Sequence, residues 1–325
     1  MDNSLQQTLT PIADGLKDFE RAFAEALGDH AGLIGAMASH VLSSPGKRIR
    51  PAMYLLTSSI ARTENYPVAV DGAVAIELIH TATLLHDDVN DSAEQRRGRP
   101  AVNRIWGNLS AVLMGDHLFA RAFRIMVRLG NAKVLNAISH ATERVAVGEL
   151  LQVQEIRNFQ LQEAGYLRII GDKTASLFAA ACESGSLLSG SDRWAGQFRS
   201  FGESVGLGFQ IADDLLDYKG NEALTGKPVG NDLREGKITL PLIFALQHGT
   251  KLERDRILER LSNGHTEGNF EEVVGFVESA GGFAYAHQRA EDYCANALEV
   301  IKDVEDSVYK RALESLVTHT VSRQS

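Results

Sequence analysis

Nearly every long segment of this chain spaces its apolar residues as a buried or amphipathic α-helix does. No alternating apolar and polar run bounded by Asn-Gly or Asp-Gly turns indicates a strand. A chain of this kind can bury its apolar faces only by packing helix against helix. Helices are expected over residues 9–26, 50–60, 68–88, 109–128, 134–156, 165–188, 194–217, 240–247, 252–261, 270–279, 283–300 and 307–321.

The length of 325 residues permits one large domain or two. No low-complexity linker or shift in composition divides the chain, and a hydrophobic content of 44% is ample for a core. Gly202, Gly206 and Gly208 are better explained as helix contacts than as a dinucleotide loop, because no strand precedes them. We therefore expect one all-α domain over residues 1–325, with its helices packed around a central cavity.

Composition argues against several classes of function. The net charge of −9 argues against a nucleic-acid surface. No apolar run is long enough to predict a membrane span, and residues 1–10 lack the apolar core of a signal peptide. Cys182 and Cys294 lack the spacing of a metal site and are typical of buried thiols in a reducing compartment. A cytoplasmic protein is expected.

The pattern Asp-Asp-x-x-Asp occurs twice, at residues 87–91 and 213–217, each time after an apolar run. The first and fifth positions of this pattern share one face of a helix. Carboxylates crowded there repel one another and lose hydration unless cations pair with them. Mg²⁺ suits such a place, because it takes one or two carboxylates and completes its shell with water and phosphate oxygens. A single copy could be a solvated acidic face, but the repeat favours a diphosphate held by several Mg²⁺ ions, with metal ligands drawn from Asp87, Asp88, Asp91, Asp213 and Asp217.

Basic residues cluster beside these acidic motifs. A glycine-containing turn at residues 45–51 carries Lys47 and Arg50, and Arg50 offers a planar fork suited to phosphate oxygens. Residues 96–99 supply three arginines directly after the first acidic motif. These arginines could simply neutralise the aspartates. With metals present they are in excess, which indicates a second anion.

Two further segments offer lysines. Lys173 and Thr174 lie within an apolar helical stretch, either as snorkelling surface groups or as inward-facing phosphate donors. Residues 225–237 are rich in glycine and carry Lys227 and Lys237. This segment is either an ordinary surface loop or a flap that closes over bound phosphates.

Two histidines, His80 and His86, flank the end of the apolar helix that precedes the first acidic motif. Their spacing does not match a zinc site, and no cysteine accompanies them. His86 is expected to be structural. His80 lies two helical turns before Asp87, within reach of a ligand beside the metals.

Together these motifs resemble those of the trans-prenyl diphosphate synthases over essentially the whole chain. Bacterial octaprenyl diphosphate synthases are the most similar branch, and the departures are small: Pro45 replaces a glycine and Asn90 a valine. The motifs that carry the resemblance are the Gly-Lys-Arg-x-Arg-Pro turn at 46–51, the aspartate-rich motifs at 84–98 and 208–218, the Lys-Thr pair at 173–174, and the end of the flap at 236–241.

The resemblance implies the isoprenoid synthase fold and a head-to-tail condensation by ionisation, coupling and deprotonation, with the departing diphosphate as the base. It implies three Mg²⁺ ions on Asp87, Asp91 and Asp213, which with Lys173 and Lys237 form the expected catalytic set. The residues implied to hold the allylic diphosphate are Arg96, Lys173, Thr174, Gln210, Lys227 and Lys237. Those implied to hold isopentenyl diphosphate are Lys47, Arg50, His80 and Arg97.

The product is expected to be long. In this family, aromatic residues just before the first aspartate motif are associated with short products, and this chain has the small Ala82 and Thr83 there. Ala82 lies about 7.5 Å along the helix axis from Asp87. We expect octaprenyl diphosphate, made from farnesyl diphosphate for quinone side chains, and a homodimer joined through the helix at 109–127. The alternatives are another product length, a class I terpene cyclase, or a non-catalytic subunit of a heteromeric synthase.

Overall fold

The computed structural model describes residues 3–28, 31–44, 46–61, 66–188, 192–219, 229–262 and 270–321. Across these ranges the chain is all-α, as expected, and the strands are confined to the short antiparallel hairpin β1 (Gln95–Arg96) and β2 (Arg99–Pro100). No helix in the described ranges is both long and apolar enough to cross a bilayer.

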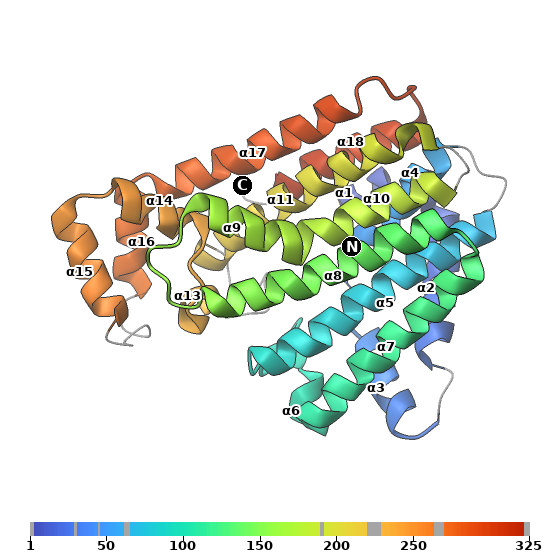
Figure 1. Ribbon diagram of the computed structural model, residues 1–325, viewed down its shortest axis with the longest axis horizontal. Coiled ribbons are helices and arrows are strands. Elements are labelled where there is room, and N and C mark those ends of the chain that lie inside the picture. The colour runs from blue at the N-terminus through green and yellow to red at the C-terminus, as the bar shows by residue number, and fades with distance from the viewer. Residues whose placement is uncertain are drawn as a thin grey trace.

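The helices follow one another along the chain and pack side by side (Figure 1). Their bounds are α1 (Asn3–Thr8), η1 (Thr10–Ile12), α2 (Ala13–Gly28), α3 (Leu33–Leu42), α4 (Ile49–Ile60), α5 (Tyr66–Asn90), α6 (Val102–Trp106), α7 (Asn108–Leu129), α8 (Ala132–Gln154), α9 (Glu163–Ile170), η2 (Gly171–Ala175), α10 (Ser176–Leu188), η3 (Asp192–Trp194), α11 (Ala195–Lys219), α13 (Asn231–Glu235), α14 (Leu240–His248), α15 (Lys251–Ser262), α16 (Phe270–Ser279), α17 (Gly282–Val300) and α18 (Val308–Val321).

The expected helices are present, with one interruption that periodicity did not reveal. The segment expected as one helix over 165–188 is divided by η2, a π-helical turn of five residues. The short helices α3 and α6 were also not anticipated, although α14 and α16, of nine and ten residues, were.

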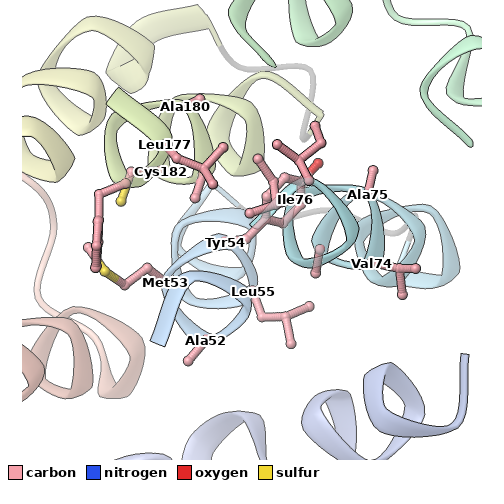
Figure 2. Packing of buried hydrophobic residues seen from close by; sticks show 14 of the residues in the cluster. Ala52, Met53, Tyr54, Leu55, Val74, Ala75, Ile76, Leu177, Ala180 and Cys182 are labelled. Atoms are coloured by element: carbon pink, nitrogen blue, oxygen red, sulfur yellow. The ribbon is translucent and has the colours of Figure 1, made fainter. Parts of the chain in front are cut away.

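Helix α5 lies at the centre of the main hydrophobic cluster because it is apolar on nearly all sides. It packs against α4 and α10, as the side chains of Tyr54, Ile76 and Leu177 illustrate (Figure 2). A second hydrophobic cluster joins α9 and the end of α11 to α13–α17, at the left of Figure 1. The two acidic motifs lie at the C-terminal ends of α5 and α11.

Glycines in α11 permit close helix contacts and explain a glycine pattern that superficially resembles a nucleotide loop. A Cβ at Gly202 would lie 2.5 Å from the Phe178 carbonyl oxygen, and one at Gly206 would lie 2.5 Å from Ala175 Cα. Both distances are shorter than a real Cβ tolerates. These positions therefore need glycine for packing against η2 and α10.

Candidate active site

Two lysines from distant segments converge on the first acidic motif. Lys173 Nζ, in η2, lies 2.7 Å from Glu149 Oε1 and 3.7 Å from Asp87 Oδ2. Lys237 Nζ, just after α13, lies 3.0 Å from Asp91 Oδ2. Lys173 therefore faces inward and is not a snorkelling surface group. The exposed faces of Asp87 and Asp91 are bordered by cations on two sides.

The three aspartates of the second motif have different surroundings. Asp214 is buried, and its carboxylate accepts hydrogen bonds from Tyr166 Oη at 2.6 Å and Gln210 Nε2 at 2.7 Å. Asp217 accepts the backbone N–H groups of residues 231 and 232 at 3.1 Å each, and so caps α13. Asp213 is the exposed member of the three.

The hydroxyl of Thr174 joins η2 to the second motif. Its Oγ1 donates to Gln210 Oε1 at 2.8 Å, and Gln210 in turn donates to Asp214. Lys173 and Thr174 are adjacent in sequence but reach different motifs, Lys173 toward the end of α5 and Thr174 toward α11. The π-helical turn thus connects the two acidic motifs.

Asp88 and Arg96 pair with each other. Arg96 donates through Nε at 2.8 Å and Nη2 at 2.5 Å to Asp88 Oδ1, and Asp88 is buried. Neutralisation of an aspartate by an arginine is thus observed for this pair. The predicted roles of Asp88 in metal binding and Arg96 in diphosphate binding stay predictions.

Buried carboxylates give the site a strong demand for positive charge. Burial, reinforced by Asp87, raises the pKa of Glu149 to about 7. Burial also raises the pKa of Asp214 to about 7. Burial alone would lower the pKa of Lys237, but Asp91 and Glu235 outweigh it and raise that pKa. Further cations nearby would favour the ionised forms of these two carboxyls.

A cluster of basic side chains lies beside the first motif. Arg50 stacks on Phe178, with 4.2 Å from its guanidinium carbon to the ring centre, and its Nη1 lies 3.2 Å from His80 Nε2. Burial, together with Arg50 and other arginines, holds the pKa of His80 well below its usual value, so this imidazole is neutral. Arg50 Nε is buried with no hydrogen-bond partner within the described ranges. An unsatisfied buried donor of this kind is suited to an anion.

The basic turn and the β1–β2 hairpin meet at this cluster. Arg97 Nη1 donates to the Ser44 carbonyl at 2.7 Å, and a Cβ at Gly46 would lie 2.5 Å from Arg97 Nη2. Lys47 is exposed on the same turn. Lys47, Arg50, His80 and Arg97 therefore come from three segments to one region, and their role in binding isopentenyl diphosphate stays a prediction.

The remaining predicted positions are accounted for as follows. Lys227 lies outside the residues that the structure describes. Ala82 is fully buried in α5, and Thr83 Oγ1 donates to the His80 carbonyl at 2.8 Å. His86 is held by packing, with its Nε2 3.1 Å from the Val112 carbonyl oxygen, in keeping with a structural role.

Sequence reasoning missed two charged residues at the site. Glu149 is the nearest partner of Lys173, although no acidic pattern surrounds it in the sequence. Arg48 is buried, has a left-handed φ of 55°, and pairs with Glu77 at 2.7 Å. The sequence analysis considered only its neighbours Lys47 and Arg50 as phosphate ligands. Glu77, an isolated acid in the apolar α5, could have indicated that a buried basic partner such as Arg48 was needed.

The residues present fit a substrate-completed Mg²⁺ site. Within the described ranges, no three side chains of His, Cys, Asp or Glu are grouped closely enough to hold an ion unaided. The end of α5 offers two carboxylates, Asp87 and Asp91, and α11 offers the exposed Asp213. That donor set is typical of Mg²⁺ bound together with phosphate oxygens.

Known proteins of similar sequence and structure agree on the family. The sequence profile of the polyprenyl synthetase family matches residues 32–277. The chain is 38% identical to the all-trans-nonaprenyl-diphosphate synthase (geranyl-diphosphate specific) of Rhodobacter capsulatus, over 98% of each chain. It is 36% identical to the octaprenyl diphosphate synthase of Escherichia coli, over 96% of each. Other relatives are named for other lengths, such as the heptaprenyl diphosphate synthase component 2 of Geobacillus stearothermophilus.

A solved structure shows the same fold. The polyprenyl synthase of Caulobacter crescentus, crystallised with calcium and isoprenyl diphosphate, superposes with a TM-score of 0.94 at 36% identity, covering 99% of this chain and 98% of that one. The fold, the paired aspartate motifs and these relatives lead to one conclusion: the chain belongs to the polyprenyl synthetase family and is a trans-prenyl diphosphate synthase.

Proposed function

We propose that this enzyme condenses isopentenyl diphosphate with farnesyl diphosphate to give octaprenyl diphosphate, which supplies quinone side chains. We also propose that residues 1–325 form one polyprenyl synthetase domain. The observation that carries the proposed site is the convergence of Lys173 and Lys237 on Asp87 and Asp91. Cations and carboxylates that face one another in this way are suited to a diphosphate with bound metal.

The metal in this proposal is Mg²⁺, three ions per site. Asp87, Asp91 and Asp213 would hold them, with Asp88 and Asp217 as further candidates. When bound, Mg²⁺ would neutralise the charge that accumulates on the departing diphosphate. Calcium in the Caulobacter relative supports a divalent cation at such a site.

The chain's own residues divide the two substrates between two pockets. Lys173, Thr174 and Lys237, with Arg96, Gln210 and Lys227, would bind the allylic diphosphate and favour its departure. Arg50, His80, Lys47 and Arg97 would orient isopentenyl diphosphate beside it. The apolar helix walls would keep water from the allylic cation. Within the described residues no side chain stands out as the final base, which leaves the departing diphosphate for that step.

The eight-unit length rests on the residues before the first aspartate motif. Ala82 and Thr83 are small, and Ala75 and Ile79 continue α5 away from the metals with only apolar side chains. An aromatic side chain at this level would obstruct a growing chain. We expect Ala82→Phe to shorten the product, because the added ring fills the passage. Mass spectrometry of the extracted polyprenols, with a melting curve to detect overpacking, tests this.

A homodimer accompanies the proposal. Helix α7 exposes large apolar side chains along its length, and α8 also exposes several. Apolar patches of this kind mark protein interfaces. Light scattering of the purified protein tests the assembly. The exposed residues are Leu109, Leu113, Phe123 and Val127 of α7, and Val147, Leu150 and Val153 of α8.

One incubation separates the candidate functions. Purified protein is supplied with isopentenyl diphosphate, farnesyl diphosphate and Mg²⁺. A discrete octaprenyl product supports the proposal, and a discrete product of another length retains the reaction class but rejects the length. A cyclic hydrocarbon would indicate a terpene cyclase. Activity only after addition of a partner protein would indicate a subunit of a heteromeric synthase.

A further inference from the structure

The π-helical turn η2 is packed between α8 and α11, and each of these helices contacts its backbone at a glycine. A Cβ at Gly148 of α8 would lie 2.4 Å from the backbone nitrogen of Lys173. On the other side, a Cβ at Gly206 of α11 would lie 2.5 Å from Ala175 Cα. Neither helix could come so close with a side chain at these positions. The turn that carries Lys173 and Thr174 is thus set between two rigid backbones.

Arg144 of α8 forms hydrogen bonds with both α11 and η2. It lies one helical turn before Gly148 on α8. Its Nη1 and Nη2 donate to the two carboxylate oxygens of Glu203 on α11, at 3.0 and 2.7 Å. Its Nε donates to Asp172 Oδ1 at 2.7 Å, and Nη2 also donates to the Gly171 carbonyl at 3.2 Å. One planar guanidinium therefore joins α8, α11 and the first two residues of η2.

This arrangement holds a backbone conformation that needs support. Single π-helical turns within α-helices are uncommon and occur frequently at functional sites. The Gly171 carbonyl, at the start of this one, accepts the Ser176 N–H five residues later and the Arg144 guanidinium. A return to ordinary α-helical pairing would rotate the residues on one side of the turn by about 100° for each residue of register. Lys173 and Thr174 would then point elsewhere.

We propose that Arg144 is a positioning residue for the allylic diphosphate. Its hydrogen bonds to Glu203, Asp172 and Gly171 hold η2 in its π-helical form, so that Lys173 faces Asp87 and Thr174 faces Gln210. This rests on the proposed function, which places Lys173 and Thr174 on the departing diphosphate. The residues assigned to isopentenyl diphosphate lie outside η2, and their nearest link to the turn is Phe178 of α10, on which Arg50 stacks.

The first test replaces Arg144 by methionine, which keeps the length of the stem and removes the fork. Because a misplacement of about 1 Å can cost about a hundredfold in rate, we expect kcat to fall about tenfold to a hundredfold. The KM for isopentenyl diphosphate should stay within about twofold, an expectation that follows from the separate pockets and not from this rate argument. Arg144→Lys should also lose activity, since an ammonium cannot replace the bidentate fork.

Arg289→Met is the matched control. Arg289 pairs with Glu163 at 3.0 Å, and its side chain is 27% exposed, against 26% for Arg144. It joins α17 to Glu163 at the start of α9, eight residues before η2 begins, so its loss should leave kcat unchanged. Glu203→Gln provides a second, milder way to weaken the Arg144 contacts if Arg144→Met melts much below the parent enzyme. It should lower kcat in the same direction with a smaller effect.

A double-mutant cycle with Lys173→Ala decides whether Arg144 acts through η2. If it does, Arg144→Met should cost less once Lys173 has been removed, with only the part that acts through Thr174 remaining, because residues that act as a unit are not additive. The same fold loss in both backgrounds would overturn the proposal, as would a folded Arg144→Met enzyme with parental kcat. A rise in the KM for isopentenyl diphosphate as large as the loss in kcat would also overturn it.

The cycle separates this inference from the proposed function. Loss of activity in Lys173→Ala but not in Arg144→Met or Glu203→Gln would remove only the positioning role. Full activity in Lys173→Ala would remove the role of Lys173 and the positioning role with it. A parent enzyme that forms no elongated product from the two diphosphates would refute the proposed reaction itself.

Discussion

The two Asp-Asp-x-x-Asp motifs are alike in sequence but differ in their surroundings. At the end of α5, the outer aspartates 87 and 91 face lysines, and the middle Asp88 is neutralised by Arg96. At the end of α11, Asp214 is held by the neutral donors Tyr166 and Gln210, and Asp217 caps α13. A repeated pattern therefore does not imply repeated roles. The first motif offers two aspartates that face the site, and the second offers chiefly Asp213.

The largest expected effect concerns the aspartates proposed as metal ligands, one from each motif. Asp87→Ala and Asp213→Ala should each lower kcat about a hundredfold to a thousandfold, because a lost transition-state contact costs roughly 3–4 kcal/mol. Steady-state rates in Mg²⁺, with circular dichroism to confirm the fold, measure this. A near-parental rate for either variant would mean that its motif is not a metal site.

The next effect separates the acidic site from the basic cluster beside it. Lys237→Ala should chiefly impair the allylic substrate, through its KM or the rate of ionisation, and Arg50→Ala should chiefly raise the KM for isopentenyl diphosphate. Each loses a charge-assisted hydrogen bond worth about 1.5–3 kcal/mol, or about tenfold to a hundredfold. Varying each substrate in turn gives the two profiles. Identical profiles would show that one pocket has been misassigned.

A smaller effect tests the role of Asp217, in the second motif, as the cap of α13. Asp217→Ala removes the cap of α13, so we expect the free energy of unfolding to fall by about 0.5–2 kcal/mol. Asp217→Asn, which keeps an oxygen that can accept one of these N–H groups, serves as the control and should lose less stability. Urea denaturation of both variants makes the comparison. Equal losses of stability would contradict the capping role of Asp217.

The smallest effect concerns the neutral His80 before the first motif. Its pKa is lowered in the folded state, so below about pH 6.5 the unfolded chain binds a proton that the folded chain does not. Stability should therefore decline as the pH falls below that value, by at most about 1.4 kcal/mol per pH unit from this group. His80→Gln should flatten the unfolding free energy between about pH 6.5 and 5. An unchanged slope would show that His80 is protonated in the folded enzyme.

Much of the site was predictable from local patterns. The periodicity of α5 and α11 placed each acidic motif at the end of a helix, and the basic turn before α4 needed only its own residues to be recognised. The resemblance carried by these motifs led to the correct family. Helical periodicity and short motifs are local properties, so a single sequence carries them in full.

The tertiary structure alone decided which side chains meet. Glu149 reaches Lys173 across 24 residues, and Arg144 reaches Glu203 across 59. Neither pair has a sequence signature, because any acidic and basic residue on packed helices could make it. The inward direction of Lys173 likewise depends on the π-helical turn, which glycines of two other helices and one arginine enclose. The sequence by itself determined the helices and their chemical groups. Tertiary packing determined which way the side chains point, because burial and ion pairing depend on contacts between segments that are distant in the sequence.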